Sequence, residues 1–114
     1  MKIEKYNFGE IVINGKNYRS DLIILNDRII ENWRRKEGHC LSIDDLKGIL
    51  NKEIEIIIIG TGYSGFMEVP DKVLKDIEKL GINVIVEKTK DAVELFNEYV
   101  KKNKKVVFAL HLTC

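Results

Sequence analysis

Hydrophobic and polar residues alternate over the first part of the chain. Ile11 and Ile13, with Phe8 before them, stand two residues apart and are bounded by the polar Glu10 and Asn14, which is typical of a half-buried β-strand. Asn14-Gly15 follows directly and is a strong signal for a two-residue type I′ turn. Because Tyr18 resumes the apolar pattern beyond this turn, we predict a β-hairpin here.

Two more strands are predicted before residue 42. Leu22–Leu25 is a short apolar run, as expected for a buried strand, and Ile29–Trp33 is predicted as another strand. Asn26-Asp27 between them predicts a second turn. The simplest account of residues 1–41 is therefore a meander of three or four strands.

The spacing of apolar residues changes to a helical period after residue 42. Leu46, Ile49 and Leu50 share one face of a helix, and Ser42 is a good N-cap in front of them. We expect a short helix that ends near Asn51.

Strands and helices then alternate to the end of the chain. The predicted elements are the strand Glu55–Ile59, the loop Gly60–Gly65, a helix that opens at Pro70-Asp71 and closes at Gly81, the strand Ile82–Val86, a helix capped by Thr89, and the strand Lys105–Leu112. The continuous apolar run in the first of these strands is typical of a strand covered on both faces.

This order predicts an α/β fold. The α-β-α-β-α-β pattern of residues 42–114 requires strands covered by helices, with right-handed crossovers between parallel neighbours. We expect a mixed central sheet flanked by two helices, to which residues 1–41 add a β hairpin or meander layer. A length of 114 residues fits a single domain over residues 1–114.

Composition and charge indicate an ordinary globular protein of the cytoplasm. Hydrophobic residues make up 45% and charged residues 32%, and a net charge of +1 gives no field to attract nucleic acid or an anionic membrane. Uninterrupted apolar runs such as Ile56–Ile59 are far too short to span a bilayer. Two cysteines, Cys40 and Cys114, fit a reducing compartment. Enrichment in Lys and Glu favours a thermophilic source, although an AT-rich genome would give a similar bias in Lys and Ile.

Gly60-Thr61-Gly62-Tyr63-Ser64-Gly65 is a literal G-x-G-x-x-G motif after a predicted strand. Glu87 even lies at the end of the next strand, where a ribose-binding acid would stand. In a dinucleotide-binding fold, however, the helix begins within the motif, so that its N-terminus faces the pyrophosphate. Here Phe66-Met67-Glu68-Val69 intervene before Pro70. We therefore expect no nicotinamide cofactor, and no other cofactor is predicted.

Two interpretations of this loop stay open. It is either a tight turn that glycine permits, or a site for a small anion or metabolite, because ligands of open α/β sheets lie beyond the carboxyl ends of the strands. Gly62 is the sensitive position, since a Cβ there would obstruct a close backbone approach or forbid a positive φ. The candidate ligand-binding residues are Thr61, Gly62, Tyr63, Ser64, Lys88, Thr89, His111 and Thr113, with Arg34 or His39 closing over them.

The histidines and cysteines form the pairs His39-Cys40 and His111-x-x-Cys114. Adjacent residues such as His39 and Cys40 are poorly placed to share one zinc ion. His111 and Cys114 have opposite parity on a strand, so their side chains face different ways. We expect no metal site. Nothing local supports a Cys–His nucleophile pair either, and no catalytic residue is assigned.

Residues 33–39, Trp33-Arg34-Arg35-Lys36-Glu37-Gly38-His39, form the one basic and aromatic stretch. Three cations and one tryptophan are too few for a nucleic-acid footprint in a neutral domain. The stretch is either a solvated turn or a contact patch for a protein or an anion, because Trp and Arg are favoured at interfaces. The candidate partner contacts are Trp33, Arg34, Arg35 and His39.

Several short motifs together resemble those of one family. They are Gly60-Thr61-Gly62, Val69-Pro70, Gly81-Ile82-Asn83-Val84, Thr89, Ala92-Val93, Asn97 and His111-Leu112-Thr113-Cys114, with a looser similarity at Tyr18, Asp21, Trp33 and His39. The family is domain-of-unknown-function family 498, which includes the adipogenesis-associated domain protein of animals and, more distantly, a mitochondrial complex I assembly factor. The resemblance implies a three-layer fold with a mixed five-stranded central sheet, and it supplies no catalytic residue.

Two functions stand as hypotheses. The first is a non-enzymatic protein-interaction or assembly factor, which the resemblance implies because eukaryotic relatives act through partner proteins. The second is a small-molecule or anion site at the strand ends, with an enzyme as one form of it.

Overall fold

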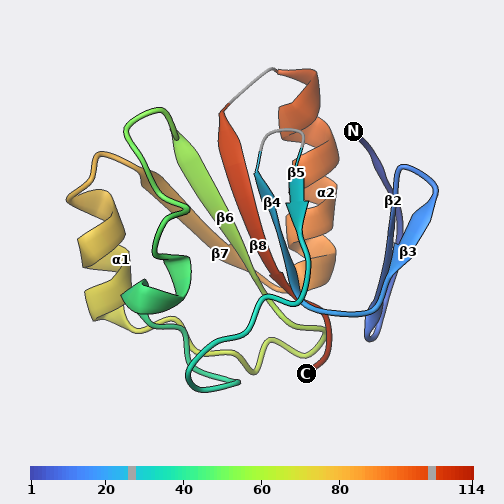
Figure 1. Ribbon diagram of the computed structural model, residues 1–114, viewed down its shortest axis with the longest axis horizontal. Helices are drawn as coiled ribbons and strands as arrows, with labels where there is room; N and C mark the ends of the chain where they lie inside the picture. The colour runs from blue at the N-terminus through green and yellow to red at the C-terminus, as the bar shows by residue number, and fades with distance from the viewer. Residues whose placement is uncertain (26–27, 103–104) are drawn as a thin grey trace.

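The computed structural model describes residues 1–25, 28–102 and 105–114, and its strands form two sheets (Figure 1). The larger sheet has the strand order β5-β4-β8-β6-β7. Its members are Leu22–Leu25 (β4), Arg28–Ile30 (β5), Ile56–Thr61 (β6), Asn83–Glu87 (β7) and Val106–His111 (β8). β6 runs parallel to β7 and β8, whereas β4 runs antiparallel to β8 and β5. The expected mixed five-stranded sheet is confirmed.

The smaller sheet is antiparallel and has the strand order β1-β2-β3. Its members are Ile3–Asn7 (β1), Glu10–Ile13 (β2) and Lys16–Tyr18 (β3). The predicted hairpin is confirmed: Asn14 and Gly15 have φ values of 50° and 79°, as a type I′ turn requires. β1 was not predicted, so residues 1–41 hold more strands than expected. The predicted turn at Asn26-Asp27 lies outside the described residues.

Three helical segments accompany the sheets: the 3₁₀ turn Ile43–Leu46 (η1), Asp71–Glu78 (α1) and Thr89–Lys101 (α2). The prediction that this helix extends to Asn51 is wrong. It ends at Leu46, because Lys47 is extended and Gly48 has a φ of +80°. α1 follows Pro70, and Gly81 ends it with a φ of +82°, as predicted. Within the described part of the chain, no helix is long and apolar enough to cross a membrane.

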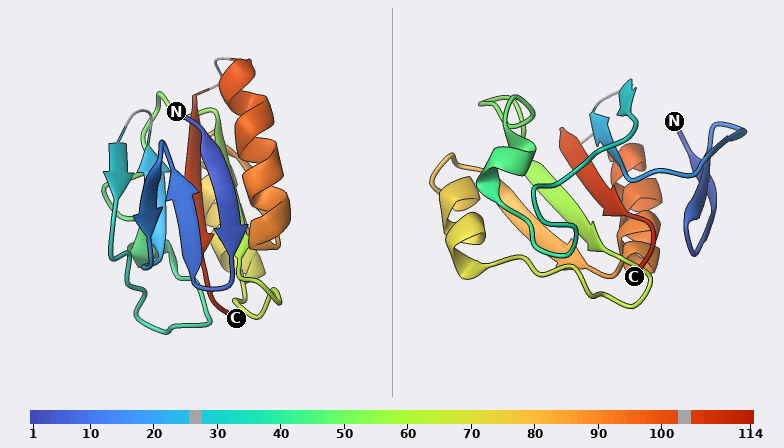
Figure 2. Two further views of the ribbon diagram at one scale, coloured as in Figure 1. Left: turned by 90° about the vertical axis from the view of Figure 1, so that its right-hand side faces the viewer. Right: turned by 60° about the horizontal axis from the view of Figure 1, so that its bottom comes forward.

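The two faces of the large sheet are covered by different elements, which gives the three layers that were expected (Figure 2). Ile57 and Ile59 of β6 pack with η1, α1 and Trp33 on one face. Ile58 packs with α2 and the small sheet on the other. This alternation follows from the two-residue period of a strand buried on both sides.

Candidate functional site

The carboxyl ends of β6 and β8 bring the predicted ligand-binding residues together. The two strands are parallel and Thr61 lies opposite His111, so the chain leaves both strands at the same end of the sheet (Figure 1). Thr89, at the start of α2, joins them because its hydroxyl accepts a hydrogen bond from the Gly62 N–H at 2.8 Å and donates one to the His111 carbonyl. This hydroxyl therefore bonds outside α2 instead of capping it. Thr61, Gly62, Thr89 and His111 are buried, Thr113 is half-buried, and Tyr63, Ser64 and Lys88 are exposed.

Backbone N–H groups in and just after the glycine loop already have acceptors within the chain. Tyr63 donates to the Thr113 carbonyl at 2.7 Å, and Phe66 donates to the Cys114 carbonyl at 2.9 Å. Gly62 has a φ of +109°, and a Cβ at this position would lie 2.3 Å from the Cys114 carbonyl carbon. The positive φ and the close backbone approach predicted for Gly62 are confirmed, and the approaching group is the chain's own residue 114.

A polar cluster surrounds the side chain of His111. Asp21 Oδ2 lies 2.7 Å from His111 Nδ1 and accepts a hydrogen bond from Arg35 Nη2, also at 2.7 Å. Asp21 Oδ1 accepts a hydrogen bond from the Leu112 N–H at 2.7 Å, and Arg35 Nε donates to the Gly38 carbonyl at 3.0 Å. The side chains of Arg35 and His111 are each only 5% exposed, and that of Asp21 is 17% exposed. We call Asp21, Arg35 and His111 the Asp21 cluster.

The geometry assigns the protons of the Asp21 cluster. A carboxylate only accepts hydrogen bonds, so neutral His111 carries its proton on Nδ1 and a lone pair on Nε2. Burial by itself raises the pKa of Asp21, but hydrogen bonds from His111, Leu112 and Arg35 outweigh it and hold that pKa below its usual value. Arg35 Nη1 and His111 Nε2 are buried and have no hydrogen-bond partner among the residues that the structure describes. The cluster thus presents one unused cationic donor and one unused imidazole nitrogen.

Two of the four predicted partner contacts in residues 33–39 are buried and two are exposed. The ring of Trp33 lies 4.6 Å from the Arg35 guanidinium, and its Nε1 donates to the Asp45 carbonyl at 3.0 Å. The ring of His39 lies edge-on to His111, with the centroids 5.6 Å apart. Trp33 and the Arg35 side chain are therefore buried, whereas Arg34 and His39 are exposed.

Three aromatic side chains are exposed around residues 112–114. Phe8 and Tyr63 are each 55% exposed, with ring centroids 5.9 Å apart, and Phe66 is 64% exposed. Gly9 donates its N–H to the Leu112 carbonyl at 2.8 Å, so the chain next to Phe8 is held beside the segment that also holds Tyr63 and Phe66. We call Phe8, Tyr63 and Phe66 the aromatic end. The prediction that Phe8 belongs to the apolar face of a half-buried strand is wrong, because residues 8–9 form the turn between β1 and β2. Phe66 was not predicted as a surface residue, because an isolated apolar residue in a loop gives no sign of its exposure.

Tyr6 connects the small sheet to this end of the molecule. Its hydroxyl donates to the Leu112 carbonyl at 2.8 Å, and its ring centroid lies 6.4 Å from that of Tyr63. Burial raises the pKa of Tyr6 to about 12, so the phenol stays protonated and keeps this hydrogen bond at neutral pH.

A family model described as a protein of unknown function (DUF498/DUF598) matches residues 3–111, nearly the whole chain. The chain belongs to the DUF498/DUF598 family. This confirms the family that the sequence motifs resemble.

Solved structures agree with the DUF498/DUF598 fold. A conserved hypothetical protein from Pyrococcus horikoshii is 28% identical, with a TM-score of 0.82 and full coverage of both chains. A protein designated MT938 is 26% identical, with a TM-score of 0.81 over 99% of this chain and 98% of that one. A Bartonella henselae protein described as an outer membrane protein is 21% identical, with a TM-score of 0.82 over 98% and 94% of the two chains, and shares the fold. The Pyrococcus relative is compatible with the thermophilic source that the composition favours.

This DUF498/DUF598 domain has two histidines and two cysteines, residue types that serve as metal ligands and nucleophiles. Its described residues contain no group of three or more His, Cys, Asp or Glu side chains placed to hold a metal ion. Desolvation raises the pKa of the Cys40 thiol, and the charges of Glu37 and Glu68 raise it further. Cys40 is therefore a protonated thiol at neutral pH and a poor nucleophile.

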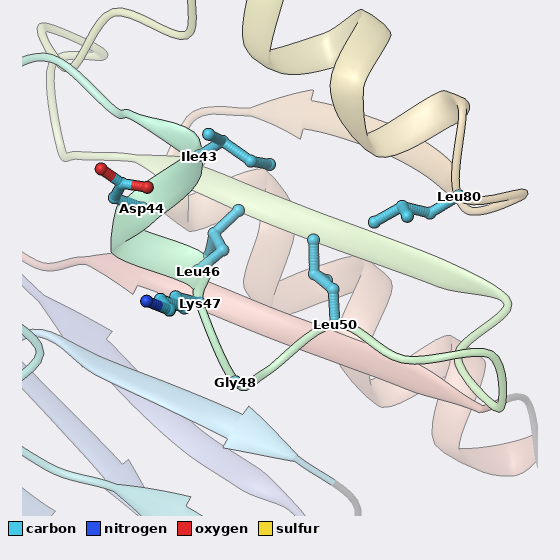
Figure 3. A pocket seen from close by; sticks show the side chains of 7 residues that line it. All are labelled: Ile43, Asp44, Leu46, Lys47, Gly48, Leu50 and Leu80. Carbon is cyan, nitrogen blue, oxygen red and sulfur yellow. The ribbon is translucent and has the colours of Figure 1, made fainter.

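A separate groove of the domain lies between η1 and the end of α1 (Figure 3). Its volume is about 290 Å³, and Ile43, Leu46, Leu50 and Leu80 provide apolar walls. Asp44, Lys47 and Gly48 complete the lining, so none of the predicted ligand-binding residues takes part in it.

Proposed function

We propose that this DUF498/DUF598 domain is a protein-interaction module that binds its partner through the aromatic end. The observation that carries the proposal is the exposure of Phe8, Tyr63 and Phe66, each more than half accessible, around one segment of the chain. The rings of Phe8 and Tyr63 form an edge-on pair. Exposed apolar groups of this kind mark interaction sites, and Tyr and Phe are enriched at the cores of protein interfaces. The family resemblance supports the same function, since eukaryotic relatives act through partner proteins.

The neighbouring polar groups define what kind of partner fits. The loop N–H groups of Gly62 and Tyr63 are bonded within the chain, so the surface presented here is mainly aromatic. Lys88 is exposed. Its side chain lies next to Gly65, because a Cβ added at Gly65 would be 3.2 Å from Lys88 Cγ. Gly65 stands between Tyr63 and Phe66 in the sequence, so Lys88 places a positive charge beside the aromatic end. A protein surface with an apolar centre bordered by carboxylates complements this arrangement.

Copurification from the source organism tests the proposal. The double variant Tyr63→Ser, Phe66→Ser removes two aromatic anchors, and Leu80→Ser is a matched control because Leu80 is also 56% exposed but lines the separate groove. Loss of an interface hot spot of about 2 kcal/mol corresponds to roughly 30-fold weaker binding. We expect a partner that is retained by wild type and Leu80→Ser and depleted to this extent by the double variant. The purified partner should then show the same ratio of dissociation constants.

Two results would contradict this function. A partner that binds the double variant as tightly as wild type would remove the aromatic end as the contact. A partner lost equally with Leu80→Ser would indicate nonspecific hydrophobic capture. The exposed Arg34 and His39 remain proposed partner contacts and can be tested with alanine variants in the same assay.

A second function is favoured by the two unpartnered nitrogens of the Asp21 cluster. Arg35 Nη1 and His111 Nε2 are buried and unused. An anion oxygen at the strand ends would accept a hydrogen bond from Nη1, and the hydroxyl of a hydrogen phosphate ion would donate to the Nε2 lone pair. The exposed ring of His39 lies next to His111 and would border such a site. This function corresponds to the small-molecule hypothesis, with the ligand held by the cluster instead of by the loop amides.

Titration with inorganic phosphate and with acetate tests this second function. Binding should raise the melting temperature and shift the ring resonances of His111, and Arg35→Lys should abolish both effects. Lys36→Met is the control, because the Lys36 side chain is a neighbouring exposed cation paired with Asp44. If neither anion shifts the His111 resonances, or if Lys36→Met abolishes the response as fully as Arg35→Lys, the anion site is refuted.

A further inference from the structure

β7 forms an uncovered edge of the central sheet. It pairs with β6 on one side, and α1 and α2 are the other elements in contact with it among those that the structure describes. Side chains of α1 and α2 belong to the core clusters on the two faces of the sheet, and every residue of β7 is exposed or only half-buried. Val86, near the end of β7, is 37% exposed.

The backbone of β7 has unused hydrogen-bonding groups along this edge. The Asn83 N–H donates to the Glu55 carbonyl at 3.0 Å, which directs residue 83 towards β6. In a parallel pair alternate residues bond to the neighbour, so Ile85 and Glu87 do the same. The N–H and C=O groups of Val84 and Val86 therefore point to the free edge.

The sequence of β7 is complementary to itself in an antiparallel arrangement. If Val84 lies opposite Val86 of a second copy, the outward backbone groups of both strands pair, and the two-fold axis passes through Ile85. The same register sets Asn83 opposite Glu87, where the amide can donate to the carboxylate. This single register thus pairs the outward backbone N–H and C=O groups, places valine opposite valine, and sets the Asn83 amide opposite the Glu87 carboxylate.

In this register, apolar side chains of the two copies meet on both faces of the sheet. Val84 packs against the core cluster that contains α1, and Ile85 packs against the cluster that contains α2. Both are half-buried in one copy, so a second copy would cover the area that they leave exposed. The like-with-like contacts would bury apolar surface on each face.

The other sheet edges carry the features that prevent such pairing. β5 has three residues and begins with Arg28, β3 begins with the exposed pair Lys16-Asn17, and the register of β1 shifts between Ile3 and Lys5. Short strands, charges and bulges are the usual protections of an edge. β7 has a continuous register over five residues, without proline and without a charge at its three central positions.

We propose that two copies of this domain associate through antiparallel pairing of their β7 strands, so that the five strands of each copy join into one continuous sheet. The proposed interface shares no residue with the aromatic end, so the dimer and the partner-binding function can each hold without the other.

Disulfide trapping tests the register directly. In a Cys40→Ser, Cys114→Ser background, Ile85→Cys places two thiols at a non-hydrogen-bonded pair, where Cα atoms lie about 4.5 Å apart and a disulfide can form. Val84→Cys is the matched control, because its counterpart in this register is residue 86 and the two thiols are separated along the strands. We expect mild oxidation to yield a covalent dimer with Ile85→Cys and a monomer with Val84→Cys. Equal cross-linking of both variants, or none of either, would overturn the proposed register.

Sedimentation velocity over a range of concentrations tests the association itself. Wild type should form a dimer, and Val86→Lys, which introduces a charge at two symmetric positions, should weaken it by roughly tenfold or more. Phe66→Lys is the control and should leave the dimer intact while disturbing the aromatic end. Circular dichroism verifies that both variants are folded. A wild type that stays monomeric, or a dimer that Phe66→Lys weakens and Val86→Lys does not, would refute the β7 interface.

Discussion

The glycine loop and the Asp21 cluster lie at the same end of the central sheet but use their polar groups differently. In the loop, the N–H groups of Gly62 and Tyr63 bond to a hydroxyl and a carbonyl of the chain itself. In the cluster, the Asp21 carboxylate is fully engaged, yet Arg35 Nη1 and His111 Nε2 are buried without a partner among the described residues. A ligand would gain more from groups that are desolvated and unpaired than from groups already bonded. Availability of unpaired polar groups, and not the presence of a glycine motif, therefore distinguishes a candidate binding site from a scaffold.

Replacement of Asp21 should give the largest effect on stability. Asp21→Ala leaves the Arg35 guanidinium buried without its counter-ion, which typically costs about 3–5 kcal/mol of the free energy of unfolding. Chemical denaturation of the variant measures this loss. The control is Asp44→Ala, because Asp44 pairs with Lys36 on the surface and both side chains are more than half exposed, so little change is expected there. Comparable losses in the two variants would show that the cluster is no more important to the fold than a surface ion pair.

Gly62→Ala should give the next largest effect. The added Cβ meets the Cys114 carbonyl at 2.3 Å and the backbone has a φ of +109°, so both conformational strain and displacement of residues 113–114 follow. Strain of about 1–2 kcal/mol and loss of two backbone hydrogen bonds of about 1 kcal/mol each give roughly 3–4 kcal/mol. Gly48→Ala separates the two causes, since Gly48 has a φ of +80° but nothing within 4 Å of a Cβ. If both alanine variants lose the same stability, the close contact with residue 114 is unimportant.

Acid should reduce the contribution of the Asp21 cluster. The pKa of Asp21 is lower in the folded state than its usual value, so the unfolded chain takes up the proton first as the pH falls. The stabilisation is present above the pKa of the unfolded state and is lost as the pH falls through that of the folded state. The stability difference between wild type and Asp21→Asn should therefore be full at neutral pH and shrink below roughly pH 4. Urea unfolding of both proteins across this range measures it, and a difference that stays constant would contradict the lowered pKa.

Ser64→Ala should have the smallest effect. Ser64 is exposed at the tip of the glycine loop, and substitutions at such positions usually change stability by less than about 0.5 kcal/mol. The melting temperature of the variant measures this. A larger loss would mean that the loop tip also belongs to the scaffold and would extend the internal bonding of the loop by one residue.

Elements with local signals were predicted well from the sequence. The Asn14-Gly15 turn and the Pro70-to-Gly81 helix depend on backbone preferences of the residues themselves, and both are confirmed. The predicted helix beyond Leu46 failed for a local reason, because Gly48 adopts a positive φ. β1 was missed because only one of its five residues is buried, so its apolar pattern is weak.

The site was predicted less completely because its contacts join distant positions. The glycine loop, Thr89 and His111 were grouped correctly by the rule that parallel strands share their carboxyl ends. The link from Asp21 to His111 joins residues 90 positions apart, and nothing in the local pattern marks Asp21 as its partner. Arg35 was predicted only as part of a basic stretch. The sequence does not show which arginine of such a stretch is buried and which is exposed.

The position of β8 has a consequence for how the domain is made. β8 lies between β4 and β6 in the central sheet, yet it is the last of its strands to be synthesised. Until Val106–His111 has left the ribosome, β4 and β6 have no common neighbour, and the strand edges that pair with β8 have no partner. Leu22 must then find Leu110 across almost the whole chain, and such non-local pairing slows folding. The nascent domain is thus most prone to aggregation immediately before its central strand emerges.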